Sequence, residues 1–190
     1  MITNGYGANQ FAILQSTSAT NMPDIASNGG GANNGHPIFV SNNAGNITLP
    51  KQPSFQVRYP GTTALNGGNG PVALIYNSVF HNVGSHYNTS NGRFTAPVTG
   101  IYVFHANLRV DGFTGNYSYM TLQHFSSTGT AQASKGRDLQ HGNSANYINH
   151  NISQNVYLLA GEYVRLVYEN NGDSSVNLDS DSYFSGYLLG

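Results

Sequence analysis

The strongest pattern in the sequence is a run of alternating side chains within "NGRFTAPVTGIYVFHANLRV", residues 91–110. On one side of an extended chain, this run places Tyr102, Phe104, Ala106, Leu108 and Val110. On the other side it places Ile101, Val103, His105, Asn107 and Arg109. Because alternate residues of a strand face opposite sides of a sheet, the run predicts a long central strand with one buried face. The half-polar second face is better explained by a neighbouring subunit than by open water.

Shorter runs with strand character recur after residue 50, at residues 55–59, 72–76, 79–81, 93–98, 117–125, 147–158, 163–168 and 182–189. Turn signals such as Asn91-Gly92 and Asn171-Gly172 separate them. No segment has a convincing helical period. Many short strands between turn signals predict an all-β sandwich or jelly roll.

The composition excludes several classes of function. Only 8% of the residues are charged and the formal net charge is −1, so the basic surface of a nucleic-acid binder or a peripheral membrane protein is missing. The chain has no Cys, and it has no apolar run of the roughly 18 residues that a membrane span needs. The first residues lack the basic and hydrophobic regions of a secretory signal. A protein of this kind acting outside a cell would leave by another route, such as lysis.

Residues 1–50 differ from residues 51–190. The first segment contains the Gly- and Asn-rich stretch "NMPDIASNGGGANNGHP", interrupted by apolar patches that are too small to fold alone. The patch residues are Phe11, Ile13, Leu14, Ile38, Phe39 and Val40. A disordered leader is one interpretation. We favour an extended arm that docks these patches on a neighbouring chain, followed at the proline-rich stretch "TLPKQPSFQVRYP" by the folded domain.

The histidines are candidates for a metal site: His36, His81, His86, His105, His124, His141 and His150. Only His81 and His86 are close in sequence, although His105, His124 and His150 lie in different predicted strands that could converge. We interpret these side chains as polar-face or interface histidines. A threefold axis could still turn one of them into a metal-binding or pH-sensitive cluster.

The oxygen-rich loop "ENNGDSSVNLDSD" supplies the one calcium candidate, formed by Asp173, Asp179 and Asp181. It lacks the spacing of an EF-hand, so a solvated loop is the favoured interpretation and no cofactor is expected. No serine lies in a Gly-x-Ser-x-Gly motif, and no glycine-rich stretch ends in the lysine of a phosphate loop. We therefore expect no enzyme activity.

The residues around the opening run resemble a known family. Asn82, Tyr87 in "SHYNTSNGRF", Phe94 and the "GIYVF" stretch have the spacing of the globular head of complement component 1, subcomponent q, and of its relatives in the tumour-necrosis-factor superfamily. The stretches "YLLAGEYVRLVYEN" and "YFSGYLL" are similar to the last two strands of that domain. The resemblance covers about residues 53–190. Tyr76, Ala106 and Ala96-Pro97 depart from the family's preferred residues.

The resemblance implies a ten-stranded jelly-roll sandwich that forms a homotrimer. It assigns core or trimer packing to Tyr87, Phe94, Tyr102, Phe104, Leu108, Val164, Leu166, Phe184, Tyr187 and Leu188. Some members of the family bind Ca²⁺ near the trimer apex, which is the additional reason to consider the aspartate loop.

The junction "GNITLPKQPSFQV" resembles the segment that precedes such heads in bacteriophage virion proteins, and no collagen-like stalk precedes the head. These features predict a trimeric capsid decoration or cement protein, a head fibre or knob on the virion surface. Its arm would be anchored to the major capsid protein or another virion protein. The alternative is a receptor-binding fibre tip that recognises a host cell-surface glycan or protein through residues 112–116 or 172–181. Neither nucleic-acid binding nor membrane insertion is expected.

Overall fold

The computed structural model describes residues 2–3, 11–15, 36–41, 46–61, 63–66, 71–142, 147–172 and 175–190. The chain divides into two units, Met1–Gln52 and Pro53–Gly190. The domain boundary expected after residue 50 lies close to this division.

The first unit contains a four-stranded antiparallel sheet in sequential order: β1 (Ile2–Thr3), β2 (Phe11–Gln15), β3 (His36–Ser41) and β4 (Ile47–Thr48). The apolar patches expected to dock on a neighbour lie in β2 and β3 and pair with one another, with Ile13 opposite Phe39. The sequence analysis did not foresee this pairing. The side-chain contacts of Phe11, Ile13, Leu14, Ile38, Phe39 and Val40 lie outside the described part of the chain, so docking through them stays a prediction.

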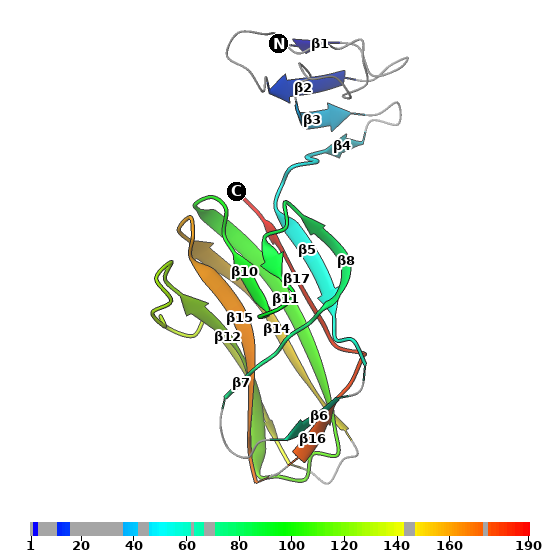
Figure 1. The fold of residues 1–190 in the computed structure, drawn as a ribbon, viewed down its shortest axis with the longest axis vertical. Coiled ribbons are helices and arrows are strands. Elements are labelled where there is room, and N and C mark those ends of the chain that lie inside the picture. Colours follow the sequence, from blue (N-terminus) through cyan, green and yellow to red (C-terminus); the bar gives the residue numbers. More distant parts are fainter. Residues whose placement is uncertain are drawn as a thin grey trace. The chain divides into compact units, whose positions relative to one another are not determined.

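The second unit consists of two antiparallel sheets (Figure 1). One has the order β13-β12-β15-β10-β9, with β7 also paired to β15; we call it the β12 sheet. Its strands are β7 (Val72–Ala73), β9 (Tyr87–Asn88), β10 (Arg93–Thr95), β12 (Tyr117–Phe125), β13 (Gly136–His141) and β15 (Tyr163–Asn171).

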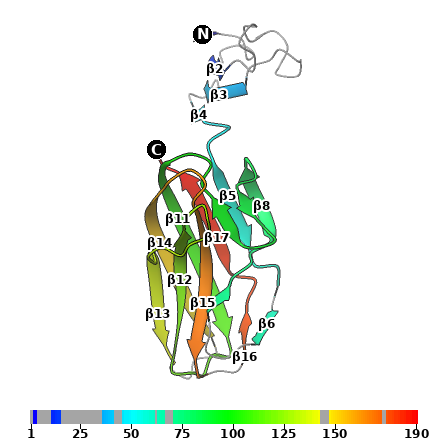
Figure 2. The ribbon, with the colours of Figure 1, turned by 60° about the vertical axis from the view of Figure 1, so that its left-hand side comes forward.

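The other, the β11 sheet, has the order β6-β16-β11-β17-β5-β8, with β14 also paired to β11. Its strands are β5 (Ser54–Arg58), β6 (Thr63–Asn66), β8 (Ser78–Val83), β11 (Gly100–Asp111), β14 (Tyr147–Leu158), β16 (Ser175–Leu178) and β17 (Tyr183–Leu188). The turned view in Figure 2 shows the two sheets as two layers, with β12, β13 and β15 in front of β11 and β14.

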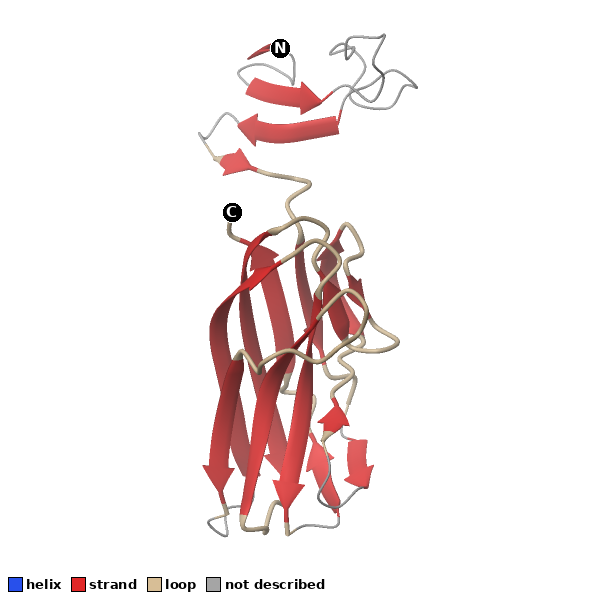
Figure 3. Ribbon diagram, turned by 90° about the vertical axis from the view of Figure 1, so that its left-hand side faces the viewer, coloured by secondary structure: helices blue, strands red, loops and turns tan. Residues whose placement is uncertain are grey.

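The described residues contain strands and loops but no helix, as the colouring of Figure 3 shows. This confirms the prediction of an all-β jelly-roll sandwich. The two sheets contain three short strands, β6, β7 and β16, in addition to the ten strands of the expected fold. Within the described ranges there is accordingly no helix that could cross a membrane.

The opening run of the sequence forms β11, the longest strand of its sheet together with β14. It pairs with β14 from Gly100 to Asp111 on one side, and with β17 and β16 on the other. Tyr102, Phe104, Leu108 and Val110 are completely buried between the sheets. The alternation in the sequence therefore corresponds directly to the two faces of a central strand.

The core is built around a cluster of aromatic rings. Phe55 lies with its centroid 4.9 Å from Tyr87, 5.0 Å from Phe94 and 4.9 Å from Phe184, and Phe104 packs against the same group. Stacked and edge-to-face pairs of this kind add to the free energy of burial. Tyr102, Leu108, Val164 and Leu166 are also buried in the core, and the partly buried Leu188 packs against it. Tyr187 is the exception, since it lies on the outward side of β17.

The structure gives a physical reason for two residues of the motifs that resemble the family, Asn82 and Gly186. The side chain of Asn82 bridges the turn after β8: its Nδ2 donates to the Tyr87 carbonyl at 2.8 Å, and its Oδ1 accepts from the Tyr87 amide at 3.1 Å. In "FSGYL", a Cβ atom on Gly186 would lie 2.6 Å from the Phe104 ring and 2.8 Å from the Phe55 ring. The absent side chain lets β17 approach the aromatic cluster.

The structure adds the short strands β6, β9 and β16, which were not predicted, and it corrects the strand assignment in two further places. The predicted strand at 72–76 pairs only over Val72–Ala73, although Leu74 and Tyr76 are still buried. The alternating apolar residues of this segment therefore indicate which side chains are buried, and they do not indicate that the segment pairs within a sheet. The strand β13, "GRDLQH", was not predicted, because an edge strand with polar side chains lacks an apolar alternation.

Candidate subunit interface and polar seam

The outward side of the β11 sheet carries an exposed apolar patch. Ile101 lies directly opposite Tyr157 of β14, and Tyr187 of β17 lies opposite Val103 of β11. Ile101, Tyr157, Tyr187 and Leu189 are 42%, 60%, 42% and 57% exposed. We call these four residues the apolar patch. Exposed apolar side chains gathered on one sheet face, at one end of neighbouring strands, are typical of interaction surfaces.

The other end of the same face is polar and already hydrogen-bonded. The Ser153 hydroxyl lies 3.0 Å from His105 Nδ1, and Asn107 Nδ2 donates to Asn151 Oδ1 at 3.0 Å. These cross-strand pairs hold amide, hydroxyl and imidazole groups in fixed positions. The half-polar face predicted from the opening run is therefore a sheet surface that is apolar toward one end and polar toward the other.

Arg109 lies at the polar end of this face and has two carboxylate partners. Its Nε donates to Asp111 Oδ1 at 2.9 Å and its Nη1 to Asp181 Oδ2 at 3.1 Å, while the guanidinium lies 4.8 Å from the Tyr147 ring centroid. The hydrogen bond to Asp111 is the main reason that the pKa of Arg109 is raised above its ordinary value. The positive charge of Arg109 is thus neutralised by the carboxylates of Asp111 and Asp181.

The predicted calcium loop overlaps this arrangement. Asp181 is paired with Arg109, and its backbone amide donates to Asp179 Oδ1 at 2.8 Å. Asp173 lies outside the described residues, so the three-ligand set stays a prediction. Within the described part of the chain, no group of three His, Asp or Glu side chains is placed to hold a metal ion.

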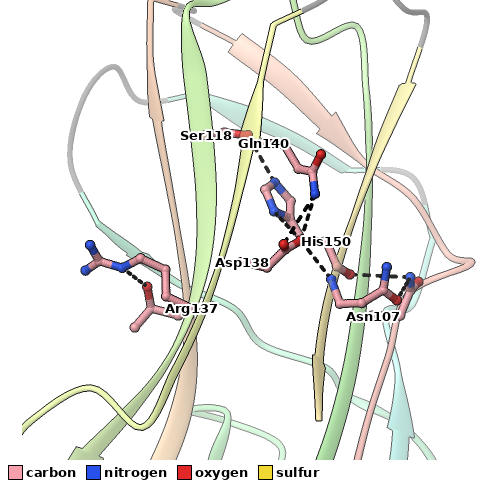
Figure 4. A network of polar contacts seen from close by, with 8 residues as sticks. Asn107, Ser118, Arg137, Asp138, Gln140 and His150 are labelled. Carbon is pink, nitrogen blue, oxygen red and sulfur yellow. Dashed lines mark hydrogen bonds and ion pairs between the residues drawn. The ribbon is translucent and has the colours of Figure 1, made fainter.

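A second polar cluster lies where the edges of the two sheets meet, and we call it the seam (Figure 4). His150 of β14 points into the sandwich, with Nε2 3.0 Å from the Ser118 hydroxyl oxygen of β12. Its Nδ1 lies 3.3 Å from Asp138 Oδ2 of β13, in an orientation that is poor for a hydrogen bond. The donor in the Ser118–His150 hydrogen bond depends on the ring tautomer: with the proton on Nδ1, toward the Asp138 carboxylate, Nε2 accepts the Ser118 hydroxyl proton.

Asp138 closes the seam. Its Oδ2 accepts the backbone amide of Asn151 at 3.0 Å, and both carboxylate oxygens accept from Gln140 Nε2, at 3.3 and 3.1 Å. Asn151 belongs to the edge strand β14, whose outward amide would otherwise be open to pairing with another strand. An inward-pointing charge at a sheet edge blocks such pairing.

The order Ser118–His150–Asp138 is that of a nucleophilic triad, but its placement is not. Ser118 and His150 are both 0% exposed, so a substrate carbonyl has no route to the serine oxygen. Burial lowers the pKa of His150, and the Asp138 carboxylate opposes that shift. We interpret the seam as a structural network that joins the two sheets.

His105 and His124 do not join the seam. His124 Nε2 lies 3.0 Å from Glu162 Oε2, and the same oxygen accepts the Leu159 amide at 2.9 Å. The Leu159 amide is the main cause, and His124 a further one, of the lowered pKa of Glu162. His105, His124 and His150 thus have separate partners and do not converge.

The loops considered for receptor binding meet at one point. The Asn116 amide donates to the Asn171 carbonyl at 2.8 Å, and the Asn116 carbonyl accepts from the Gly142 amide at 2.9 Å. Residues 173–174 and 143–146 lie outside the described residues, so the loop surface is known only in part.

The sequence model of the C1q domain matches residues 55–189. The chain belongs to the C1q domain family. The rat "Complement C1q tumor necrosis factor-related protein 6" is 29% identical over 136 residues, which are 67% of this chain. The match spans 46% of the length of that relative, so this C1q domain chain covers less than half of it.

Solved structures show the same fold at low sequence identity. The globular domain of zebrafish complement 1qA has a TM-score of 0.54 and 17% identity, over 73% of this chain and 98% of its own. Murine APRIL at pH 5.0 has a TM-score of 0.56 and 11% identity, over 73% and 100%. Eiger TNF from S. frugiperda has a TM-score of 0.54 and 9% identity, over 74% and 94%.

Sequence reasoning missed the residues of the seam. Ser118, Asp138 and Gln140 sit in strands whose sequences show no motif, and their proximity follows only from the pairing of β13 with β12 and of β14 with β11. A signal was present in His150, a polar residue that lies between Ile148 and Ile152 on the mainly apolar side of its strand. A buried histidine needs a partner from the facing sheet.

Proposed function

We propose that this C1q domain chain is a structural protein that assembles as a homotrimer through the outer face of the β11 sheet. The observation that carries the proposal is the apolar patch of Ile101, Tyr157, Tyr187 and Leu189, exposed in the single chain. Covering such a patch removes apolar area from water, which is the main favourable contribution to association. The polar end of the face, with His105 and Asn107, supplies hydrogen-bonding groups around the patch.

A closed trimer also fits the sheet edges. In the β11 sheet, β14 lies at one edge, with its Asn151 amide capped by Asp138. Pairing of another strand with this edge is therefore disfavoured at Asn151, whereas rotation about one axis covers one face per subunit and closes.

We further propose that the trimer decorates a bacteriophage capsid, held there by residues 1–50. Two features support this assignment. The junction before β5 resembles that of phage virion proteins, and Ile47 and Leu49, the apolar side chains described in this segment, are both exposed. Three arms on one trimer would raise the avidity for neighbouring capsid subunits through effective concentration.

The arm is tested by cosedimentation of the purified chain with empty capsids that lack it. Full-length protein should pellet with the capsids, and the double variant Ile47→Asp/Leu49→Asp should remain in the supernatant as a folded trimer. Thr48→Asp, an exposed position between the two, adds one of the two negative charges without removing an apolar side chain and serves as the control. Undiminished capsid binding by a chain of residues 53–190 would refute the docking role. Competition of the isolated protein with phage for host cells would instead favour the receptor-binding alternative.

A further inference from the structure

The outward side of the β12 sheet, opposite to the proposed interface, carries a pair of arginines on a pair of aromatic rings. The rings of Phe125 and Tyr163 stack with centroids 4.8 Å apart and an interplanar angle of 7°. The guanidinium carbon of Arg93 lies 4.5 Å from the Tyr163 centroid, and that of Arg165 lies 4.7 Å from the Phe125 centroid. Each ring of the stack therefore carries one guanidinium group.

The register places the two arginines directly opposite each other on β10 and β15, beside the cross-strand pair of Tyr163 with Phe125. Like charges in opposite positions of a sheet destabilise it. The stacked rings offset part of that cost through cation–π attraction. The arrangement concentrates two positive charges in a chain that has only 7 Lys and Arg residues.

These charges are not neutralised by their surroundings. No carboxylate of the described residues lies within ion-pair distance of either guanidinium, and the buried Nε atoms of Arg93 and Arg165 have no hydrogen-bond partner there. Two other stacked arginines have partners of different kinds: carboxylates for Arg109, and a neutral hydroxyl for Arg137. Arg109 has Asp111 and Asp181, and Arg137, which lies over Tyr119, donates from its Nε to Thr121 Oγ1 at 3.2 Å.

We propose that Arg93 and Arg165 bind the carboxylate or sulfate group of an acidic polysaccharide. Stacking on a ring fixes the plane of a guanidinium, and because each Nε is buried, the two terminal Nη groups are the donors that remain to receive an oxyanion through two parallel hydrogen bonds. Two such groups side by side recognise one anionic group or two successive ones on a chain. The anion also removes the repulsion between the paired arginines.

The neighbouring side chains favour a sugar over an acidic peptide. In the strand register, Asn88 lies opposite Arg93, Thr95 opposite Tyr163, and Gln123 opposite Arg165. These amides and the hydroxyl lie at least partly in solvent and suit the hydroxyl groups of a sugar. None of them offers an apolar seat for the side chain of a peptide.

The site does not depend on the proposed virion function. It lies on the outward face of the β12 sheet, whereas the proposed subunit contact uses the outward face of the other sheet. Failure of the trimer or of capsid docking would not remove the arginine pair, and loss of sugar binding would leave assembly unchanged.

Isothermal titration calorimetry of the full-length protein tests the site with defined probes. The acidic probes are trigalacturonate and a sulfated galactose trisaccharide, whose comparison distinguishes carboxylate from sulfate. The neutral galactose trisaccharide, sodium sulfate and hexaglutamate are the reference ligands. The variants are Arg93→Gln/Arg165→Gln, which removes both charges, and Arg93→Lys/Arg165→Lys, which keeps the charges without the planar donors. Lys51→Gln controls for the loss of a charge elsewhere, and sedimentation shows that each variant keeps its assembly state.

At least one acidic trisaccharide should bind at lower concentration than the reference ligands. The Gln variant should bind it at least about tenfold more weakly, as expected for the loss of charge-assisted hydrogen bonds. The Lys variant should also lose most of the affinity, and Lys51→Gln should lose none. Equal binding by wild type and the Lys variant would reduce the effect to general charge attraction and overturn the proposal. Preference for hexaglutamate, binding of sodium sulfate as tight as that of the sugars, or no binding of either acidic probe would overturn it as well.

Discussion

His150 Nε2 lies 3.0 Å from the Ser118 hydroxyl oxygen, although the two residues belong to different sheets of the sandwich. Together with Asp138, which also receives the Asn151 amide, this contact joins β12, β13 and β14 at one edge of the fold. The ring is held uncharged in the interior, because burial lowers the pKa of His150. The stability of the seam therefore depends on pH.

We expect the protein to lose stability as the pH falls from 7 to 5.5. The pKa of His150 in the folded chain lies below the ordinary value of 6.5, so the unfolded chain takes up this proton first on acidification. Stability is fully present above pH 6.5 and declines below it. His150→Gln keeps an amide between Ser118 and Asp138 but cannot titrate, so its urea-unfolding midpoint should change less over this pH range. Protein concentration is held constant, since assembly shifts the midpoint.

His86 provides the comparison for this experiment. Burial lowers its pKa in the same direction, but it is only partly buried, whereas His150 is completely buried. His86→Gln should therefore remove less of the pH dependence than His150→Gln does. An unchanged slope in His150→Gln would show that the seam histidine does not cause the acid sensitivity.

Asp138→Ala should destabilise the fold by about 1–3 kcal/mol, because it leaves the Asn151 amide without its acceptor and removes the carboxylate beside the buried His150 ring. Hydrogen exchange at the Asn151 amide should become faster. Asp181→Ala is the matched control, since this carboxylate is 72% exposed and its pair with Arg109 is screened by water. Equal effects of the two substitutions on the free energy of unfolding would contradict the role assigned to Asp138.

Gly186→Ala should cost about 1–3 kcal/mol in stability, since the new methyl group meets the rings of Phe104 and Phe55 in a closely packed core. Gly61→Ala tests the specificity of this effect: a Cβ there has no neighbour within 4 Å and the backbone is not left-handed. Thermal unfolding of both variants beside the wild type measures the difference. A neutral Gly186→Ala would mean that the aromatic cluster can move aside.

Much of the fold could be predicted from the sequence, because a strand buried on one face has an apolar residue at every second position. The alternation through Tyr102, Phe104 and Leu108 predicted the central strand and its buried face, and turn signals such as Asn91-Gly92 marked its neighbours. At Gly92 the backbone has φ 69°, which explains the glycine.

The parts that escaped prediction depend on partners far away in the sequence. The polar strand β13 has no pattern of its own and is held by pairing with β12. The apolar patch contains residues of β11, β14 and β17, and it exists only after those strands are ordered side by side. The paired Arg93 and Arg165 are likewise a product of register, since they are 72 positions apart in the chain.

The central claim is that the outward face of the β11 sheet joins three copies of the chain. Sedimentation equilibrium measures this directly for the wild type, for Ile101→Asp/Tyr187→Asp, and for Leu139→Asp, an exposed apolar position on the other sheet. We expect three times the chain mass of 20.3 kDa for the wild type and for Leu139→Asp, and a single chain mass for the double variant. A monomeric wild type, or a double variant that remains trimeric, would contradict the claim.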